Sequence, residues 1–455
     1  MRFANRPRRY LSAMREISSP LSGFASPFGP QRGFNPLRIF ANDEPGVWFE
    51  ANDANTLFTD VAGTTPVTTP GDAVALQLDK SGRGNHRTQA TTAARPLYAL
   101  HPVGGVRNLL EYTEEFDNAV WLTGGLSDLV PSLDAPSEGP SSSFVFTPTT
   151  STSGSHTLRQ NISISGGITQ TVYAKASGYN FFALTFDNIA SKAVRFDLSN
   201  GTVTSEGADV TGSIELIGDG WYRVSVTIET GCSSVSWYSL HTDGFTSFAG
   251  DGISGTLIAG AQLEEGSTAT NYQRVGSFLD VSEEGKARRG RLWYNGTSHT
   301  METGTITPGT DKVQVFAGVR ALGGSIIAEH GVAGTDDGVF TMQESVAFGS
   351  QGTIFRAASF SKTNPYTSVI TGLGDISGGT VTLRIDGTQV AQSIVGQGTG
   401  NFLAHPLYFG ARAGTFAFFN GYEDTSIIRF GPNLDADTIS KVESYVASKT
   451  PEETI

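Results

Sequence analysis

Acidic side chains are the first place to look for chemistry in this sequence, because two carboxylates that face each other across a cleft can hydrolyse a glycosidic bond. No strand-like segment carries acids at alternating positions. Asp435 and Asp437 lie two residues apart, but they stand where a helix begins. Glu283 and Glu284 are followed by basic residues in a polar turn. Helix capping and solvation explain these pairs, so the sequence predicts no hydrolytic site within one segment.

Other common catalytic motifs are missing as well. The sequence has no G-x-S-x-G nucleophile elbow, no H-E-x-x-H zinc motif and no phosphate-binding P-loop. Its seven histidines are scattered singly, so no pair has the spacing of metal ligands. We therefore expect a protein that is not an enzyme. A polysaccharide depolymerase whose carboxylates meet only in three dimensions is the less favoured alternative.

The composition favours a β-sheet protein with many tight turns. Glycine makes up 55 of the 455 residues, and only 16% of the residues are charged. Serine and threonine are abundant between short apolar segments, which is typical of short strands joined by polar turns. The chain is long enough for two or three domains.

Residues 1–38 differ in charge from the rest of the chain. They hold seven arginines and one glutamate, a net charge of +6, which leaves −19 for the other residues. Five prolines and recurring single aromatic residues predict an extended arm without a core of its own. We interpret residues 1–44 as a basic arm that anchors the chain in a larger assembly, and a tail without a partner is the alternative. The candidate anchoring residues are Arg2, Arg6, Arg8, Arg9, Tyr10, Arg15, Phe24 and Phe28.

Charge and hydropathy exclude two classes of partner. An acidic body repels phosphate backbones, so we expect no nucleic-acid partner. No apolar run is long enough to cross a membrane, and no apolar segment of a secretory signal follows the N-terminal arginines. Cys232 is the only cysteine, so an intrachain disulfide is excluded, and we expect a small buried side chain.

Two distant segments bracket a block of different character. The first is NLLEYTEEFDNAVW (Asn108–Trp121), and the second is GAQLEEGSTATNY (Gly260–Tyr272). Between them lie short segments of alternating polar and apolar residues, such as ITQTVYAKA and WYRVSVTIE, which predict an antiparallel sandwich or jelly roll. The predicted domains are the arm, one sandwich made of residues 45–105 and 277–455, and an inserted jelly roll of residues 106–276.

The last part of the chain contains a hairpin signal and the clearest helix. Asp386-Gly387 in TVTLRIDGTQVAQ predicts a tight turn between two strands. The segment NLDADTISKVESYVASKT predicts a helix that Asp435 caps. Val442 and Val446 lie on one apolar face, which should pack on a sheet.

Several short segments of the sequence resemble known families. The two flanks resemble concanavalin A-like (laminin-G-like) domains of tailed-phage structural proteins, in LFTDVAGTTPVT, LDKSGRGNH, AARP and TVTLRIDGTQVA. The block between them resembles the phage head-spike fibre domain and related jelly-roll carbohydrate-binding modules, in the two bracketing segments and in SGSHTLRQNISIS, TVYAKA, VRFDLSNGTV and GDGWYRVSVT. The resemblance implies an all-β protein of two antiparallel β-sandwiches, with a C-terminal helix and an extended N-terminal arm.

The resemblance also implies a carbohydrate-binding surface in the inserted block. Flat aromatic rings stack on the apolar faces of sugars, and polar side chains bind the sugar hydroxyls. Because neighbouring strand residues point to opposite faces, one ring of the Trp237-Tyr238 pair should face outward or toward another surface. The alternative is an ordinary surface or interface aromatic. The candidates are Trp237, Tyr238, Tyr179, Phe181 and His241.

Related modules hold a structural calcium ion near the joined ends of the fold. Glu111, Glu114 and Asp117 are carboxylates at that place in the sequence and could provide its ligands. A solvated acidic turn is the alternative explanation. We expect no other cofactor.

The function that the resemblance implies is that of a virion component, a head spike or fibre on the surface of a phage or phage-like particle. Such a protein would attach to capsid or tail proteins through residues 1–44 and would bind host cell-surface polysaccharide. It would work as a homo-oligomer. A structural decoration protein that binds no sugar is the main alternative.

Overall fold

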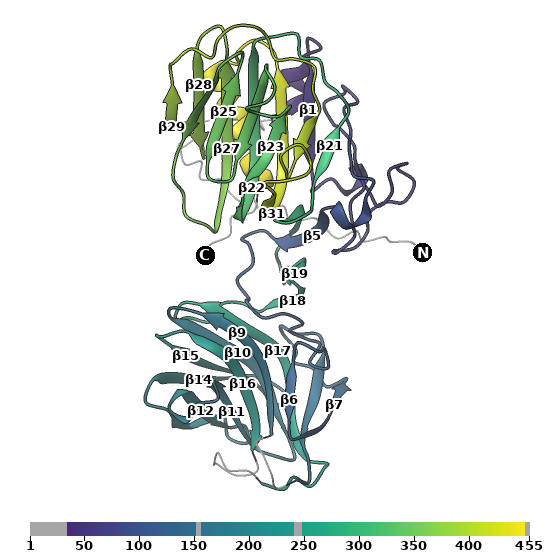
Figure 1. Ribbon diagram of the computed structural model, residues 1–455. Coiled ribbons are helices and arrows are strands. Elements are labelled where there is room, and N and C mark those ends of the chain that lie inside the picture. The colour runs from purple at the N-terminus through teal and green to yellow at the C-terminus, as the bar shows by residue number, and fades with distance from the viewer. Residues whose placement is uncertain (1–33, 152–155, 241–247, 451–455) are drawn as a thin grey trace, which may run out of the picture. The chain divides into compact units, whose positions relative to one another are not determined.

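The computed structural model describes residues 34–151, 156–240 and 248–450, which form an all-β protein with one α-helix (Figure 1). The described residues from Asn35 onward make up one compact unit. Four sheets account for the strands. Every strand pair is antiparallel apart from β19 with β5.

Two sheets are built from the two ends of the sequence. The β31 sheet has the order β18-β19-β5-β20-β31-β22-β27-β28-β29, and β1 pairs with β31 beside this path. Its strands are β1 Gly46–Glu50, β5 Leu97–Pro102, β18 Gln273–Ser277, β19 Asp280–Glu283, β20 Arg288–Asn295, β22 Lys312–Gly324, β27 Tyr366–Asp375, β28 Thr380–Ile385, β29 Thr388–Ser393 and β31 Phe419–Phe430. Figure 1 shows the purple strand β1 among the green and yellow strands of the C-terminal part.

The β23 sheet has the order β2-β3-β4-β21-β30-β23-β24-β25-β26. Its strands are β2 Leu57–Phe58, β3 Leu76–Gln77, β4 Arg87–Thr88, β21 Met301–Thr303, β23 Ile326–His330, β24 Val339–Gln343, β25 Ala347–Gln351, β26 Phe355–Ser359 and β30 Leu407–Phe409. One apolar core joins this sheet to the β31 sheet; Phe49 and Phe430 enter it from one side and Phe340 and Phe409 from the other.

The other two sheets come from the block between the bracketing segments. The β10 sheet has the order β14-β15-β10-β17-β8-β7, and the β11 sheet has the order β13-β12-β11-β16-β9-β6. The strands are β6 Leu122–Gly124, β7 Leu126–Ser132, β8 Ser143–Pro148, β9 Thr157–Ile164, β10 Ile168–Ser177, β11 Phe181–Phe186, β12 Ala193–Asp197, β13 Thr202–Glu206, β14 Val210–Gly218, β15 Trp221–Ile228, β16 Cys232–Leu240 and β17 Gly255–Glu265. A second core lies between these sheets and contains the buried side chain of Cys232.

The predicted fold class is confirmed: the protein has two antiparallel β-sandwiches and one C-terminal helix. In the part of the chain that the structure describes, strands β6 to β17 pair only with one another. The bounds of the two sandwiches as separate domains stay a prediction.

Side chains of the two bracketing segments hold the ends of the inserted block together. The Asn108 amide donates to the backbone oxygens of Ala261 and Gln273, each at 2.8 Å, and its oxygen accepts from Leu263 N at 3.1 Å. The Thr113 hydroxyl accepts from Val275 N at 2.9 Å. These contacts satisfy buried backbone groups. The chain can therefore leave the sandwich of the β31 and β23 sheets, which we call the first sandwich, and return to it at one place.

Short helices complete the fold, and the one α-helix is α1, Ala436–Lys449. Its cap is confirmed: Thr438 N donates to the Asp435 carboxylate at 2.7 Å. Val442 and Val446 are buried on the side that faces the β31 sheet. The hairpin turn is confirmed too, since Asp386 and Gly387 between β28 and β29 both have positive φ, 48° and 80°. The 3₁₀ helices are η1 Pro36–Phe40, η2 Ala54–Thr56, η3 Thr92–Ala94 and η4 Ala190–Lys192.

The sandwich begins earlier than the end of the predicted arm. Helix η1 buries Ile39 and Phe40, and Arg429 on β31 donates from Nε to the backbone oxygen of Ile39 at 2.6 Å. Residues from Pro36 onward therefore belong to the packed body. The eight candidate anchoring residues of the arm all lie outside the described residues.

One buried carboxylate makes a pH-dependent contribution to the stability of the first sandwich. The Glu329 side chain on β23 is fully buried, and Arg412 donates from Nε to its Oε2 at 3.0 Å. Burial raises the pKa of Glu329 to about 7 against the opposing effect of Arg412. A raised carboxyl pKa means that the folded state holds a proton that the unfolded state has lost. This contribution therefore favours folding at low pH and disappears as the pH rises through the folded pKa.

Between about pH 5 and about pH 8, we expect the free energy of unfolding of the Glu329→Gln variant to rise by about 1–3 kcal/mol relative to that of the wild type, because only the wild type carries the Glu329 contribution. The buried side chains of His101 and His330 have lowered pKa values and contribute with the opposite sign, but they do so equally in both proteins. Urea denaturation at both pH values measures the difference. Glu302→Gln is the matched control, because Glu302 is exposed on strand β21 of the same sheet. Equal pH dependence of the wild type and the Glu329→Gln variant would contradict the assignment.

Candidate functional site

The aromatic residue predicted most prominently for sugar stacking, Trp237, lies in the second core. It is 1% exposed, and its ring packs 4.8 Å from Trp121 and 5.4 Å from Phe116 between ring centroids. Its indole nitrogen donates to Gln170 at 3.2 Å. Its large apolar ring lies on the inner face of β16, between the β10 and β11 sheets. Trp237 is therefore a core residue and offers no ring to a ligand.

Tyr238 and Tyr179 are covered as well, whereas Phe181 on β11 is only partly buried. Tyr238 lies on the opposite face of β16 from Trp237, as the pleat predicts, but it is 3% exposed and packs with Leu240 and partly buried Phe181. Tyr179 is 6% exposed, and its hydroxyl accepts from Asp251 N at 3.1 Å. The two rings therefore lie on opposite faces of β16 as expected, but neither is exposed, because Tyr238 packs in a small apolar cluster on the outer face. His241 lies outside the described residues.

The three carboxylates predicted as calcium ligands do not converge. Glu114 is buried and accepts hydrogen bonds from the backbone and hydroxyl of Ser141, at 3.1 and 2.8 Å. Asp117 is exposed, and Glu111 is half-buried. Within the described ranges, no group of three His, Cys, Asp or Glu side chains could hold a metal ion. Glu114 instead fixes the loop that precedes β8.

A groove on the outer face of the β10 sheet is the best candidate site. It consists of two hollows of about 850 and 360 Å³ that share Glu215 and Arg223. The larger hollow, which we call the cleft half, runs past the segment 136–141 and the turn at Glu283-Glu284. The smaller hollow, which we call the hydroxyl half, lies over β10, β14 and β15 beside the segment 267–269.

Strand pairing places the floor residues of the groove in three cross-strand rows. Each row takes one residue from β14, one from β15 and one from β10, in that order. The rows are Thr211-Thr227-Thr169, Ser213-Ser225-Thr171 and Glu215-Arg223-Tyr173. Alternate residues of a strand share one face, so the three rows follow one another along a single surface.

Hydroxyl groups dominate the hydroxyl half. Thr169 and Thr227 share a hydrogen bond of 2.9 Å between their hydroxyls, and Ser213 and Ser225 share one of 2.7 Å. A hydroxyl has one donor and two acceptor positions, so each pair keeps capacity for a further partner. This floor can exchange hydrogen bonds with a polyhydroxylated ligand.

Arg223 stands where the two halves meet. Its guanidinium lies 5.8 Å from the ring centre of Tyr173, and Nη2 donates to the backbone oxygen of Thr270 at 2.5 Å. Nη2 also lies 3.5 Å from the Thr171 hydroxyl. Nε is buried and has no hydrogen-bond partner among the described residues. The arrangement holds a cation in place while leaving part of its hydrogen-bonding capacity for a ligand.

Specific side-chain contacts hold one wall of the cleft in place. Trp221 is fully buried next to Tyr173, and its indole nitrogen donates to Asp134 at 3.0 Å. Lys175 on β10 reaches the other Asp134 oxygen at 2.8 Å. These two bonds tie the segment after β7 to the outer face of the β10 sheet, so the cleft has a fixed edge.

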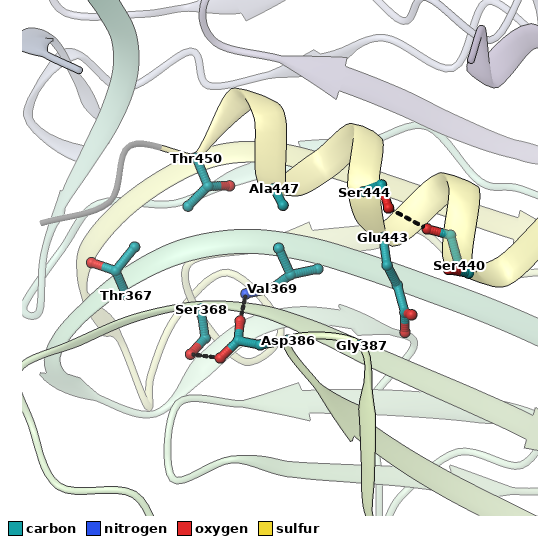
Figure 2. Close-up of a pocket in the computed structure, with 10 residues that line it drawn as sticks. All are labelled: Thr367, Ser368, Val369, Asp386, Gly387, Ser440, Glu443, Ser444, Ala447 and Thr450. Carbon is teal, nitrogen blue, oxygen red and sulfur yellow. Dashed lines mark hydrogen bonds between the residues drawn. The ribbon is translucent and has the colours of Figure 1, made fainter. Parts of the chain in front are cut away.

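A second cavity of about 500 Å³ lies between α1 and the β27-β28 part of the β31 sheet (Figure 2). Its two carboxylates already have partners within the protein. Asp386 accepts from Val369 N at 2.8 Å and from the Ser368 hydroxyl at 3.0 Å, as Figure 2 shows. Glu443 accepts from Arg384 at 2.7 and 3.0 Å. This cavity offers a ligand fewer free groups than the groove does.

Comparison with known proteins gives no family. No family model matches the sequence, and no curated protein matches it. No helix in the described ranges is long and apolar enough to cross a membrane.

Three solved structures illustrate the level of structural likeness. The Ruminococcus gnavus IT-sialidase CBM40 bound to alpha2,3 sialyllactose has 12% identity and a TM-score of 0.25, over 31% of this chain and 97% of that one. Mouse laminin alpha1 chain, domains LG4-5, has 9% identity and a TM-score of 0.23, over 68% and 96%. A structure named NanB plus Optactamide has 14% identity and a TM-score of 0.23; the match covers 29% of this chain and spans only 23% of that one. Likenesses at this level assign no function.

The burial of Trp237 predicts an effect on stability. We expect Trp237→Ala to lower the free energy of unfolding by about 3–5 kcal/mol, because it opens a cavity between Trp121 and Phe116. Urea denaturation followed by circular dichroism measures this loss. Phe181→Ala is the control, because Phe181 is only partly buried and should cost less. A Trp237→Ala variant as stable as the wild type would contradict the core assignment.

Proposed function

We propose that this chain is a spike or fibre on the surface of a phage or phage-like particle, and that it binds host cell-surface polysaccharide through the groove on the β10 sheet. The observation that supports the binding role is the set of three cross-strand rows. Hydroxyl, guanidinium and carboxylate groups meet there on one surface, beside a cleft large enough for a sugar chain. The arm attaches the chain to capsid or tail proteins, and several copies act together.

The direction of the groove suits a linear ligand. Successive rows are two residues apart along a strand, which is about 7 Å. A polysaccharide that lies along the strands meets the two hydroxyl rows and then the Glu215-Arg223-Tyr173 row. Hydrogen bonds between neutral groups are worth about 0.5–1.5 kcal/mol each in water, so each site binds modestly and several copies per particle provide the avidity.

A structural decoration protein without sugar binding is the second candidate. One observation favours it: of the described aromatic candidates, Trp237, Tyr238 and Tyr179 are buried, and Phe181 is only partly exposed, so none presents a fully open ring for stacking. A measurement of glycan binding separates the two candidates, because only the first requires the groove to bind sugar through hydrogen bonds.

Blocking the groove should abolish glycan binding. We expect Ser213→Trp to weaken binding to host polysaccharide by at least about tenfold, because Ser213 is exposed in the middle row and a bulky ring there would fill the hydroxyl half. A glycan array followed by titration measures the loss. Ser163→Trp is the matched control, since Ser163 is exposed on β9 of the other sheet. An array without hits for the wild type would favour the decoration protein, and equal binding by both variants would move the site elsewhere.

The arm should decide attachment to the particle. We expect the full chain to restore density on particles that lack the protein and the shortened chain 35–455 to fail, because it has lost most of the basic residues of the arm. Residue 35 is the right starting point, since Pro36–Phe40 is packed on the body. Electron microscopy of the particles reads out the result. Equal attachment of the shortened chain would show that the sandwiches themselves dock.

A further inference from the structure

Three carboxylates line the cleft half without partners in the protein. Glu138, Glu215 and Glu284 are exposed there, and none of them forms a hydrogen bond or ion pair with the described residues. Two other acids of the same lining are satisfied. Glu114 accepts from Ser141, and Glu283 pairs with Arg107 at 2.9 Å. The three free carboxylates are therefore available to a ligand.

The hydroxyl of Tyr173 lines the same cleft as these three carboxylates. The Tyr173 side chain is 5% exposed, lines the cleft, and forms no hydrogen bond with another described residue. Burial raises the pKa of its hydroxyl, Arg223 opposes the rise, and Glu138, Glu215 and Glu284 each add to it. The cleft lining therefore contains a hydroxyl group that is available to a ligand.

We propose that the cleft half binds the ammonium group of an amino sugar, with the Tyr173 hydroxyl as a hydrogen-bond acceptor and the three carboxylates as counter-charges. This inference rests on the proposed function, because it names the class of glycan that the groove takes. The charge balance supports it. Arg274 is paired with Asp280 at 3.3 Å, so Arg223 is the basic side chain of this lining without a carboxylate partner. Three unpaired carboxylates face this one unpaired cation, so the unpaired charge of the lining is negative and favours a cationic group.

Two other occupants fit the cleft less well. A metal ion needs several ligands at once, and no three acidic, His or Cys side chains come close enough together within the described ranges. A lysine-rich peptide would satisfy the carboxylates but would leave the adjoining rows of hydroxyls without hydroxyl partners. The two halves are continuous through Glu215 and Arg223, so a ligand that carries both amines and hydroxyls fits the whole groove.

The test compares glucosamine oligomers with N-acetylated oligomers of the same length and linkage, titrated into the full chain in a mildly acidic buffer that keeps the amines protonated. We expect the glucosamine oligomer to bind at least about tenfold more tightly. Glu138→Gln, Glu215→Gln and Glu284→Gln should each weaken its binding about two- to fivefold. Tyr173→Phe keeps the ring and should weaken it about three- to tenfold. Glu229→Gln is the matched control, because Glu229 is exposed outside the groove.

The outcomes separate this inference from the proposed function. Equal affinity for the two oligomers, with both lost in Ser213→Trp, would overturn the selection of an amine and leave the polysaccharide-binding groove in place. A lysine peptide of equal charge that binds as tightly as the glucosamine oligomer, with the same sensitivity to Glu215→Gln, would overturn the assignment to sugars. Failure of every glycan to bind would overturn both proposals.

Discussion

The burial of charge on strand β31 is the constraint on which the rest of the structure depends. Asp424 is fully buried and accepts from Arg291 at 2.6 and 3.1 Å, and its neighbour Glu423 accepts from Arg87 at 2.9 Å. Removal of one partner from a buried ion pair costs about 3–5 kcal/mol, because it leaves an uncompensated charge. Arg87 comes from before the inserted block and Arg291 from after it. Strand β31 can therefore be buried only when both flanks have come together, and that closure brings the two ends of the block side by side.

The closure also completes the groove. Once the flanks meet, Asn108 and Thr113 bind the chain that returns through Gln273 and Val275. The turn after β19 then places Glu284 in the cleft lining, next to residues of the β10 sheet. The candidate site is thus built from the jelly roll and from the first residues that follow it, so neither the jelly-roll sequence nor the flank sequence contains the whole site.

Local signals in the sequence predicted local structure well. The cap at Asp435, the turn at Asp386-Gly387 and most strands depend on neighbours in the chain, and the structure has them. The site was missed for a different reason. Serine and threonine on a strand look alike whether they bind a ligand or meet solvent, and the alternation in WYRVSVTIE shows only that Arg223 and Ser225 share a face. The rows exist because β15 pairs with β10, a strand far away in the sequence. The register of such a pair cannot be read from the sequence of either strand alone. The burial of both Trp237 and Tyr238 could not be predicted either, because alternation along a strand gives the face on which a ring lies but not what covers that face.

A site built from hydroxyls rather than from exposed rings has a consequence for how the protein can work. Aromatic stacking buries apolar surface, whereas hydroxyl pairs such as Ser213-Ser225 exchange one set of hydrogen bonds for another and gain little per contact. Charge-assisted hydrogen bonds are about twice as strong as neutral ones, so in the proposed function we expect the row that Arg223 and Glu215 share to contribute most of the affinity of a single groove. Weak single sites become effective when many of them are held at one surface. On the particle that we propose, individually weak sites would also allow contacts with a cell to be exchanged. In the proposed function, the polar groove and the basic arm are parts of one arrangement, because attachment of many copies through the arm would provide the multiplicity that weak binding in the groove requires.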